Sequence, residues 1–436
     1  MGSLFRILGE APLGTILRLQ WGHAVFTAAA VALGLSAPRH PRILIVSNGH
    51  GEDAIACSIA AELLQLGADL EAIAVVGEGH AYAKLGIELV APAKTMPSGG
   101  FVYMDWRQFW RDVWGGLGWL TWQQMRAIKQ RGQQADIVLA VGDIVVLAMA
   151  WLSGAPYAYV GTAKSDYYLR DEHQSHHPFR RWLERFLPLA PPTPYFPWER
   201  WMMSRDRCRA IFPRDSLTAK NLERFQLPVC DFGNPMMDDL APTAPIAAIP
   251  ANTPAVLVLP GSRVPEAYRN WERLVDVVRH LPQDYACFAA IAPGLDLDVL
   301  QKVQQSLSRP IALIRGHFGS CLHRADVAIA MTGTATEQCI GLGKPAITIP
   351  GTGPQFVPAF AASQSTHLGS SVYYVPEGSA AAAAQVQQAI ERPCPELWQR
   401  NGRQRMGEAG ASRRIADRVI AIGKQLRSDR HASSEA

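Results

Sequence analysis

The chain has 436 residues and a mass of 47.7 kDa, which exceeds one ordinary domain and predicts two domains of about 200 residues each. Hydrophobic residues make up 48% and charged residues 18%, a balance that excludes a disordered protein. The net charge of +4 is too small to indicate a nucleic-acid partner by itself. The seven cysteines form no CxxC pair, so we expect a reducing, cytoplasmic compartment without a disulfide framework or a zinc site.

Residues 1–41 precede the first predicted strand and form an N-terminal extension. Its apolar run, residues 24–35, has about half of the roughly 20 residues that a membrane-spanning helix needs. We therefore expect a dispensable extension that lies on a membrane surface. A membrane anchor, a targeting segment and a mis-assigned start remain alternatives.

Buried strands alternate with helices from Arg42 onward. The first helix follows the first strand, and Gly67 suits its C-terminal cap. This alternation predicts a doubly wound sheet with ligands at the carboxyl ends of its strands. The strands are expected at 42–48, 70–77, 137–143, 156–162, 209–215 and 229–234.

Residues 241–254 contain four prolines and no hydrophobic period, which predicts a linker. The same pattern then restarts and ends with helices that run to about residue 427. The sequence therefore predicts two α/β domains, 42–240 and 255–430, that face a central cleft. The strands of the second half are expected at 255–263, 286–292, 310–315, 327–333 and 345–351.

The loop SNGHGED, residues 47–53, joins the first strand to its helix. Its glycines allow a tight turn and the close approach of a ligand. The loop presents His50, Glu52 and Asp53 at a helix N-terminus, and a histidine near neutral pH can remove a proton from a hydroxyl. In the alternative interpretation Asp53 caps the helix and His50 is a turn residue. The spacing is not GxGxxG, so we exclude a dinucleotide site.

LPGSR, residues 259–263, ends the first strand of the second half. The backbone amides near Ser262 and the guanidinium of Arg263 suit a phosphate oxygen. No Lys-Ser/Thr pair follows, which excludes a Walker loop. The alternative is a turn with a surface arginine.

The segment 331–338 predicts a strand that leads directly into a helix. Small residues, Gly333 and Thr334, leave the first helical amides open for a diphosphate. Glu337 lies in the first turn, beside Gln338, where its carboxylate can accept both hydroxyls of a ribose. A second small-residue loop with Gln355 follows the next strand, as a nucleotide-sugar pocket requires. The alternative is a capped helix with an acid in its first turn.

Five of the twelve tryptophans fall within residues 101–131, together with five basic and two acidic residues. Aromatic residues mixed with arginines are typical of a bilayer interface, so we predict an acceptor and membrane surface here. Core packing is the alternative. A second basic stretch, residues 400–430, could also face anionic lipid or be a solvated helix face. The tryptophans are Trp106, Trp110, Trp114, Trp119 and Trp122.

Other apparent motifs carry no functional prediction. Asp296 and Asp298 have the DxD spacing of metal-dependent sugar transferases, but they begin a helix, where capping is the expected role. His173, His176 and His177 lack a supporting carboxylate or cysteine, so we expect no metal. No nucleic-acid-binding motif is present.

LPGSR at 259–263, GNPMMDDL at 233–240 and TGTATEQCIGLGKPAITIP at 332–350 resemble motifs that lipid A disaccharide synthases carry in the same order. The likeness runs from residue 42 to about residue 420. SNGHGED departs from that family's GExSGD loop and is more similar to a related group known from cyanobacteria. The loop also resembles those of the lipid II-forming N-acetylglucosaminyltransferase and of monogalactosyldiacylglycerol synthase.

The resemblance implies a GT-B fold, in which two Rossmann-like domains face a cleft. It further implies an inverting, metal-independent hexosyltransferase that needs no cofactor, acts on a UDP-sugar and a membrane lipid, and lies on the cytoplasmic face of a membrane. By motif match, Glu337 holds the ribose and Gln355 the sugar. The same match implies that the diphosphate is bound by Gly333, Thr334 and Arg263.

Inversion requires a proton acceptor on one side of the sugar and stabilisation of the leaving diphosphate on the other. His50 is the first choice of base, with Asp53 or Asp143 orienting it or acting instead. Asp143 falls where lipid A disaccharide synthases carry an essential aspartate. Amides of a helix N-terminus and Arg263 would meet the departing charge.

Two other functions remain open. A UDP-sugar 2-epimerase shares this fold and also uses carboxylates, but it needs no tryptophan-rich face. A catalytically inactive, membrane-associated lipid-binding protein is the other alternative. The sequence names neither the sugar nor the acceptor lipid, and it predicts no oligomeric state.

Overall fold

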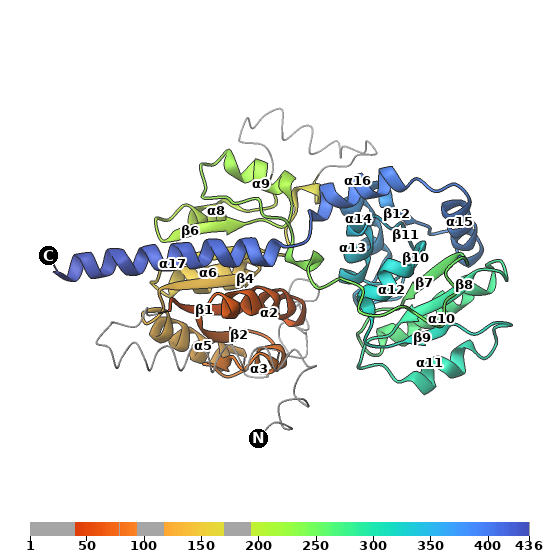
Figure 1. Ribbon diagram of the computed structural model, residues 1–436, viewed down its shortest axis with the longest axis horizontal. Coiled ribbons are helices and arrows are strands. Elements are labelled where there is room, and N and C mark those ends of the chain that lie inside the picture. The colour runs from red at the N-terminus through yellow and green to blue at the C-terminus, as the bar shows by residue number, and fades with distance from the viewer. Residues whose placement is uncertain (1–39, 78, 94–116, 170–192, 436) are drawn as a thin grey trace, which may run out of the picture. The chain divides into compact units, whose positions relative to one another are not determined.

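The computed structural model describes residues 40–77, 79–93, 117–169 and 193–435, and the elements named below belong to the compact unit Arg42–Ala436. Within these ranges the chain forms two six-stranded parallel sheets with helices on their faces (Figure 1). Residues 1–39, Trp106, Trp110, Trp114 and the three histidines at 173, 176 and 177 lie outside the described ranges.

Both sheets have the same strand order, which confirms the predicted doubly wound fold. The first runs β3-β2-β1-β4-β5-β6 and the second β12-β11-β10-β7-β8-β9. The order reverses between β1 and β4 and between β7 and β10, the places where such sheets bind ligands. The first six strands are Arg42–Ser47, Asp69–Ala74, Glu88–Leu89, Ile137–Gly142, Tyr157–Gly161 and Cys208–Phe212. The second six are Ala255–Leu259, Ala286–Ala290, Ala312–Ile314, Val327–Ala330, Ala346–Thr348 and Val372–Tyr374.

The helices of the first sheet divide between its two faces. One face is covered by α2 (His50–Gln65), α3 (His80–Lys84) and α17 (Ala411–Glu435), which share one hydrophobic core with the sheet. The opposite face carries α5 (Leu117–Gly132), α6 (Ile144–Leu152), α8 (Pro197–Met203) and α9 (Ser216–Glu223) around a second core. The central strand β4 is buried along its whole length, as a parallel strand covered on both faces must be.

The second sheet is covered in the same way. α10 (Glu266–Arg279), α11 (Leu297–Gln304) and α15 (Ser379–Glu391) pack on one face, and α12 (Phe318–Arg324) and α13 (Thr334–Gly341) on the other. Two further helices, α14 (Pro358–Leu368) and α16 (Pro395–Met406), contribute side chains to both cores.

The last helix, α17, packs against the first sheet although it follows the second in sequence (Figure 1). Ile415, Ala416 and Val419 are fully buried in the core that β1, β4 and α2 share. The predicted second domain, 255–430, therefore places its final helix in the core of the first sheet.

Local predictions had mixed outcomes. Gly67, with φ of 81°, directly follows the last turn of α2, as predicted. Asp296 caps α11, also as predicted, and accepts a hydrogen bond from the Asp298 amide at 2.9 Å. The strand expected at 229–234 is wrong. Only Val229 bridges to Ile211, after which the chain turns at Gly233 (φ 81°) and leaves the sheet.

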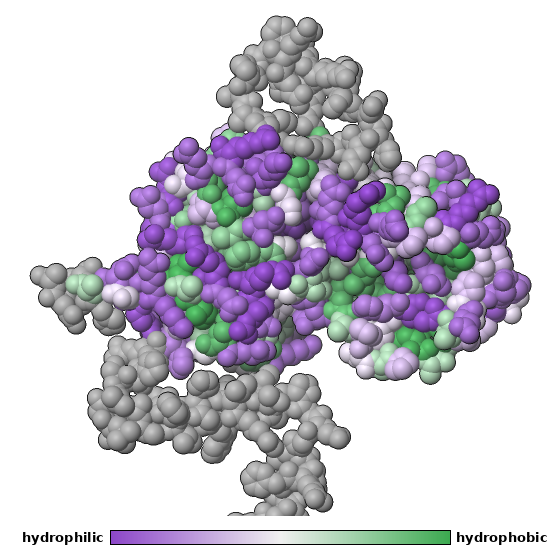
Figure 2. All heavy atoms as spheres, turned by 45° about the horizontal axis from the view of Figure 1, so that its top comes forward, coloured by the Kyte–Doolittle hydropathy of each residue, from purple (hydrophilic) through white to green (hydrophobic). Residues whose placement is uncertain are grey.

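Figure 2 shows that hydrophilic side chains predominate on the face in view, with smaller hydrophobic patches between them. Among the helices that the structure describes, none is both long enough and apolar enough to cross a bilayer.

Candidate active site

The predicted catalytic residues lie at the carboxyl edge of the first sheet, beside its strand reversal. Residues 48 and 49 follow β1 and lead into residues 50–53, the first turn of α2, and Asp143 directly follows β4, the neighbouring strand. Lys164 follows β5, and Arg214 follows β6. Four adjacent strands thus direct polar side chains to one edge.

Asp53 is buried within the loop rather than presented at its surface. The Ser47 hydroxyl lies 2.5 Å from Asp53 Oδ1 and donates to it, and the same hydroxyl lies 2.6 Å from the hydroxyl of Tyr82. This buried network holds the first turn of α2 against the sheet. No side chain caps α2, so the alternative role of Asp53 as the cap is wrong. Its share in proton transfer stays a prediction, as does that of His50, whose side chain lies outside the described part.

Asp143 is the N-terminal cap of α6 and accepts a hydrogen bond from the Val145 amide at 2.8 Å. Burial raises the pKa of its carboxyl, and hydrogen bonds from Val145 and Asn48 and the charge of Lys164 partly offset that rise. Because Asn48 belongs to the loop after β1, this hydrogen bond ties the two strand ends on either side of the reversal.

Glu52 is the carboxylate that the sequence prediction left out of the catalytic set. Its Oε2 lies 3.2 Å from the position a Cβ on Gly49 would take, and its Cγ lies 3.4 Å from that of Gly142. Glu52 therefore packs between the ends of β1 and β4. Gly49 and Gly142 have φ of 115° and 143°, so a side chain at either would be strained as well as crowded.

The environment of Glu52 raises the pKa of its carboxyl to about 7. Burial is the main cause, and the negative charges of Asp143 and Asp53 add to it, whereas a backbone hydrogen bond and the positive charge of Arg263 oppose it. A carboxyl near neutral pKa is suited to general acid–base chemistry. The signal in the sequence was a first-turn glutamate preceded by two glycines, but burial is not visible in a sequence.

The predicted donor residues lie at the carboxyl edge of the second sheet. Ser262 and Arg263 follow β7 and are exposed, and Gly333 and Thr334 follow β10, the neighbouring strand. Gly333 begins α13 without a side-chain cap, so the first amides of that helix are not satisfied by a cap. This is the arrangement that an anionic group such as a diphosphate requires.

Helix α10 holds the three loops of this edge together. The buried Asn270 amide donates to the carbonyl oxygens of Pro260 at 3.1 Å and Met331 at 3.2 Å. The buried Glu266 carboxylate accepts from the backbone amides of Gln355 at 3.0 Å and Phe356 at 2.6 Å. Neither residue was predicted, because a side chain that bonds only to backbone leaves no motif in the sequence.

Glu337 is buried in the first turn of α13 and is ion-paired to a residue of the first sheet. Its Oε2 lies 3.0 Å from a guanidinium nitrogen of Arg214. His367 Nε2 lies 4.0 Å from Oε1, but burial and the charges of Arg214 and Arg405 lower the pKa of His367 to about 2. The imidazole is therefore neutral, and Arg214 supplies the countercharge.

The other predicted donor residues are placed as follows. The Gln338 side chain donates to the Met236 carbonyl at 2.9 Å, which ties α13 to the segment before the linker. Gln355 lies in the loop after β11, and β11 neighbours β10, the strand that precedes Gly333. Trp122 is exposed on α5, whereas the side chain of Trp119 is outside the described part.

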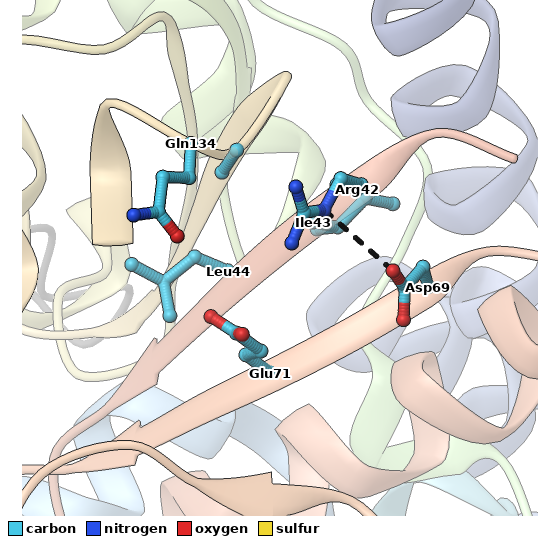
Figure 3. A pocket seen from close by; sticks show the side chains of 7 residues that line it. Arg42, Ile43, Leu44, Asp69, Glu71 and Gln134 are labelled. Atoms are coloured by element: carbon cyan, nitrogen blue, oxygen red, sulfur yellow. Dashed lines mark ion pairs between the residues drawn. The ribbon is translucent and has the colours of Figure 1, made fainter. Parts of the chain in front are cut away.

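A small hollow at the opposite edge of the first sheet does not suit a sugar nucleotide. It lies at the amino ends of β1 and β2, where Arg42 pairs with Asp69 at 3.6 Å (Figure 3). Its volume of about 10 Å³ admits roughly one water molecule. Within the described ranges, no group of three or more His, Cys, Asp or Glu side chains is placed to hold a metal ion.

The chain shows a distant similarity to curated lipid-A-disaccharide synthases, whereas no family model matches it. The synthase of Solibacter usitatus is 25% identical over 230 residues, which are 49% of this chain and 57% of that protein. The synthase of Alkalilimnicola ehrlichii is 32% identical over 157 residues, 33% of this chain and 40% of that protein. The chain thus spans little more than half the length of these relatives at most, and its similarity to the cyanobacterial group stays a prediction.

Solved structures with the same two-sheet fold cover most of the chain. CalG4, the calicheamicin glycosyltransferase, has a TM-score of 0.56 at 15% identity and covers 88% of this chain and 98% of its own. Staphylococcus aureus MnaA with UDP has a TM-score of 0.54 at 13% identity, covering 87% and 96%. Acinetobacter baumannii MurG has a TM-score of 0.51 at 14% identity, covering 86% and 98%. These similarities confirm the GT-B fold.

Proposed function

We propose that the chain is an inverting glycosyltransferase that moves a sugar from a UDP-sugar to a membrane lipid without a metal ion. One observation carries the proposal. The Glu52 carboxyl, at the edge of the first sheet, is influenced by two charges. One is the negative charge of Asp143 at the same edge, and the other is the positive charge of Arg263 at the edge of the second sheet. A candidate proton acceptor and a cation for the leaving diphosphate are thus within electrostatic range of each other. The distant similarity to lipid-A-disaccharide synthases supports the same reaction class.

On the donor side, Arg263 and the open amides at Gly333 and Thr334 meet the diphosphate, with Ser262 beside them. Glu337 accepts hydrogen bonds from the ribose. Two glutamines complete the donor site. Gln355 contacts the sugar, and Gln338 contributes through its hydrogen bond to the Met236 carbonyl, which precedes the linker.

On the acceptor side, the lipid hydroxyl attacks the anomeric carbon from the face opposite the diphosphate. Its proton passes to a base as the new C–O bond forms, and the bond from the anomeric carbon to the phosphate oxygen breaks with its electron pair on UDP. The raised pKa of Glu52 supports it as the acceptor of that proton, with Asp143 beside it. His50 remains a candidate base in the same loop.

A lipid acceptor requires a protein surface that touches the bilayer, and one face of the first sheet has the composition for it. Five of the ten exposed large hydrophobic side chains in the described ranges belong to α5, α6 and α8, which share one core, and a sixth is Phe196, the N-terminal cap of α8. They are Trp122, Val145, Leu152, Phe196, Trp198 and Trp201. The α6 part of this face begins beside Asp143, the cap of that helix.

Three aromatic rings on this face have a cation next to them. Arg126 lies 5.8 Å from the ring centre of Trp122, Lys164 lies 4.5 Å from that of Phe196, and Arg205 lies 4.6 Å from that of Trp201. Aromatic rings with basic neighbours favour the interface of an anionic membrane. We therefore place the membrane at the α5–α6–α8 face.

The second basic stretch, residues 400–430, is a weaker candidate for the membrane surface. Arg405 is fully buried, Arg413 pairs with Glu62 at 3.2 Å, and Arg427 pairs with Asp136 at 2.6 Å. These three charges are engaged by other groups of the chain, whereas most other basic residues of the stretch are exposed on α16 and α17.

The proposal is tested by incubating the purified chain with radiolabelled UDP-sugars and total membrane lipid, followed by thin-layer separation. We expect label in a lipid-soluble product and release of UDP. A UDP-sugar 2-epimerase, whose fold is also found among the structural neighbours, would convert the UDP-sugar to its epimer without lipid. Epimerisation contradicts transfer, and an unchanged UDP-sugar would instead support an inactive lipid-binding protein.

A further inference from the structure

We propose that Arg214, at the carboxyl end of the first sheet, is a positioning residue for the ribose-binding carboxylate of the second. The inference rests on the proposed function, because it assigns Glu337 to the ribose of a UDP-sugar. It adds that this part of the donor site is completed by a residue of the other sheet.

The geometry ties Arg214 firmly in place. Its side chain is 4% exposed, and Nη1 donates to the carbonyl of Thr162 at 3.0 Å, at the end of β5. Nη2 lies 3.0 Å from Glu337 Oε2. The backbone amide of Glu337 donates to the Gly333 carbonyl at 3.1 Å, which fixes its main chain in the first turn of α13 while Arg214 restrains the carboxylate.

One oxygen of Glu337 remains for a ligand. Within the described ranges the polar group recorded near Oε1 is His367 Nε2, at 4.0 Å, which is beyond hydrogen-bond distance. Oε2 is held by Arg214. A ribose hydroxyl that donates to Oε1 therefore meets a carboxylate whose rotation is already restricted, which lowers the entropic cost of binding.

The pair is also required electrostatically. A buried carboxylate without a countercharge is strongly unfavourable, and the neutral His367 cannot supply that charge. Burial lowers the pKa of Arg214, but the negative groups around it, chiefly Glu337, raise it above its ordinary value. Arg214 therefore stays charged at every pH at which the protein functions.

The two partners of this ion pair belong to different sheets. Arg214 follows β6 of the sheet that carries Glu52 and Asp143, and Glu337 belongs to the sheet that carries the diphosphate loops. Loss of Arg214 should therefore damage ribose recognition while it leaves the diphosphate contacts of Arg263 and Thr334 in place.

The test compares UDP with 2′-deoxy-UDP by isothermal titration calorimetry. In the unmodified chain we expect UDP to bind about tenfold more tightly or better. We expect R214Q to weaken UDP binding by a similar factor while hardly changing binding of 2′-deoxy-UDP, so that discrimination disappears. R214K, which keeps the charge, should restore part of it. The double variant R214Q/E337Q should bind UDP no worse than R214Q alone.

R427Q is the matched control, because it breaks another charged pair, with Asp136 at 2.6 Å, at the opposite edge of the first sheet. It should leave discrimination intact, and thermal melting of every variant checks the fold. Preserved discrimination in R214Q overturns the inference, as does an equal loss for both nucleotides. An unmodified chain that binds no UDP contradicts the proposed function instead.

Discussion

Glu52 shows how the surroundings of a residue, rather than its position in the sequence, make it a candidate base. In the sequence it is one of two adjacent acids in a glycine-rich loop, and nothing in the spacing separates it from Asp53. In the structure Asp53 is engaged by Ser47, whereas Glu52 lies among Asp143, Asp53 and Arg263 with a pKa of about 7. The loop could be predicted as a catalytic segment, but the residue within it depends on long-range packing.

The pKa of Glu52 predicts the pH dependence of transfer. A base must be deprotonated, so turnover should rise with pH and level off above about 7. Glu52→Gln should lower kcat by about 10²–10⁴ and remove this limb of the profile. Steady-state kinetics from about pH 5.5 to about pH 9 measure both effects. An unaltered profile in Glu52→Gln would transfer the role to His50 or Asp143.

The same pKa predicts that the stability of the folded protein falls with pH in the range in which turnover rises. Because folding raises the pKa of Glu52 from 4.5 to about 7, ionisation opposes the folded state, fully above pH 7 and not at all below pH 4.5. Glu52→Gln should raise the free energy of unfolding at pH 8 by up to about 3 kcal/mol. Urea unfolding at pH 8 and pH 5 checks this, and a gain that is as large at pH 5 would contradict the assignment.

At the scale of elements, α10 explains why the donor loops keep their shape. Glu266 accepts the amides of Gln355 and Phe356, and Asn270 joins the loops after β7 and β10. The strands that precede these loops could be predicted, because buried parallel strands are continuous apolar segments. The edge strands β3 and β12, two and three residues long, were not predicted from the sequence.

Glu266→Gln should weaken UDP binding about tenfold, since a charge-assisted acceptor of two backbone amides becomes a neutral one that also brings a donor. Calorimetry with UDP measures the change. Glu272→Gln, an exposed position on the same helix, is the control and should bind like the unmodified chain. Equal affinity for all three proteins would show that Glu266 does not organise the loop.

The α5–α6–α8 face makes a prediction about membranes. Trp198 is 54% exposed, so Trp198→Ser together with Trp201→Ser should reduce binding to anionic vesicles severalfold without loss of UDP binding. Co-sedimentation with vesicles that contain anionic lipid measures the effect. Val299→Ser, at an exposed apolar position on α11, provides the matched control. Unchanged sedimentation of the double variant would remove α8 from the membrane surface.

At the scale of the whole molecule, several contacts join the two sheets. Arg214 pairs with Glu337, the charge of Arg263 acts on Glu52, and α17 returns to pack on the first sheet. The two-sheet fold was predictable from the repeated alternation of strands and helices. These contacts were not, because each joins residues far apart in the sequence and none belongs to a local pattern.

We propose that UDP binds at the carboxyl edge of the second sheet, facing Glu52 and Asp143. A crystal structure of the chain with UDP tests it most directly. We expect the diphosphate at the amides of Gly333 and Thr334 and the ribose on Glu337. A nucleotide bound elsewhere, for example at the amino ends of β1 and β2, would contradict the account.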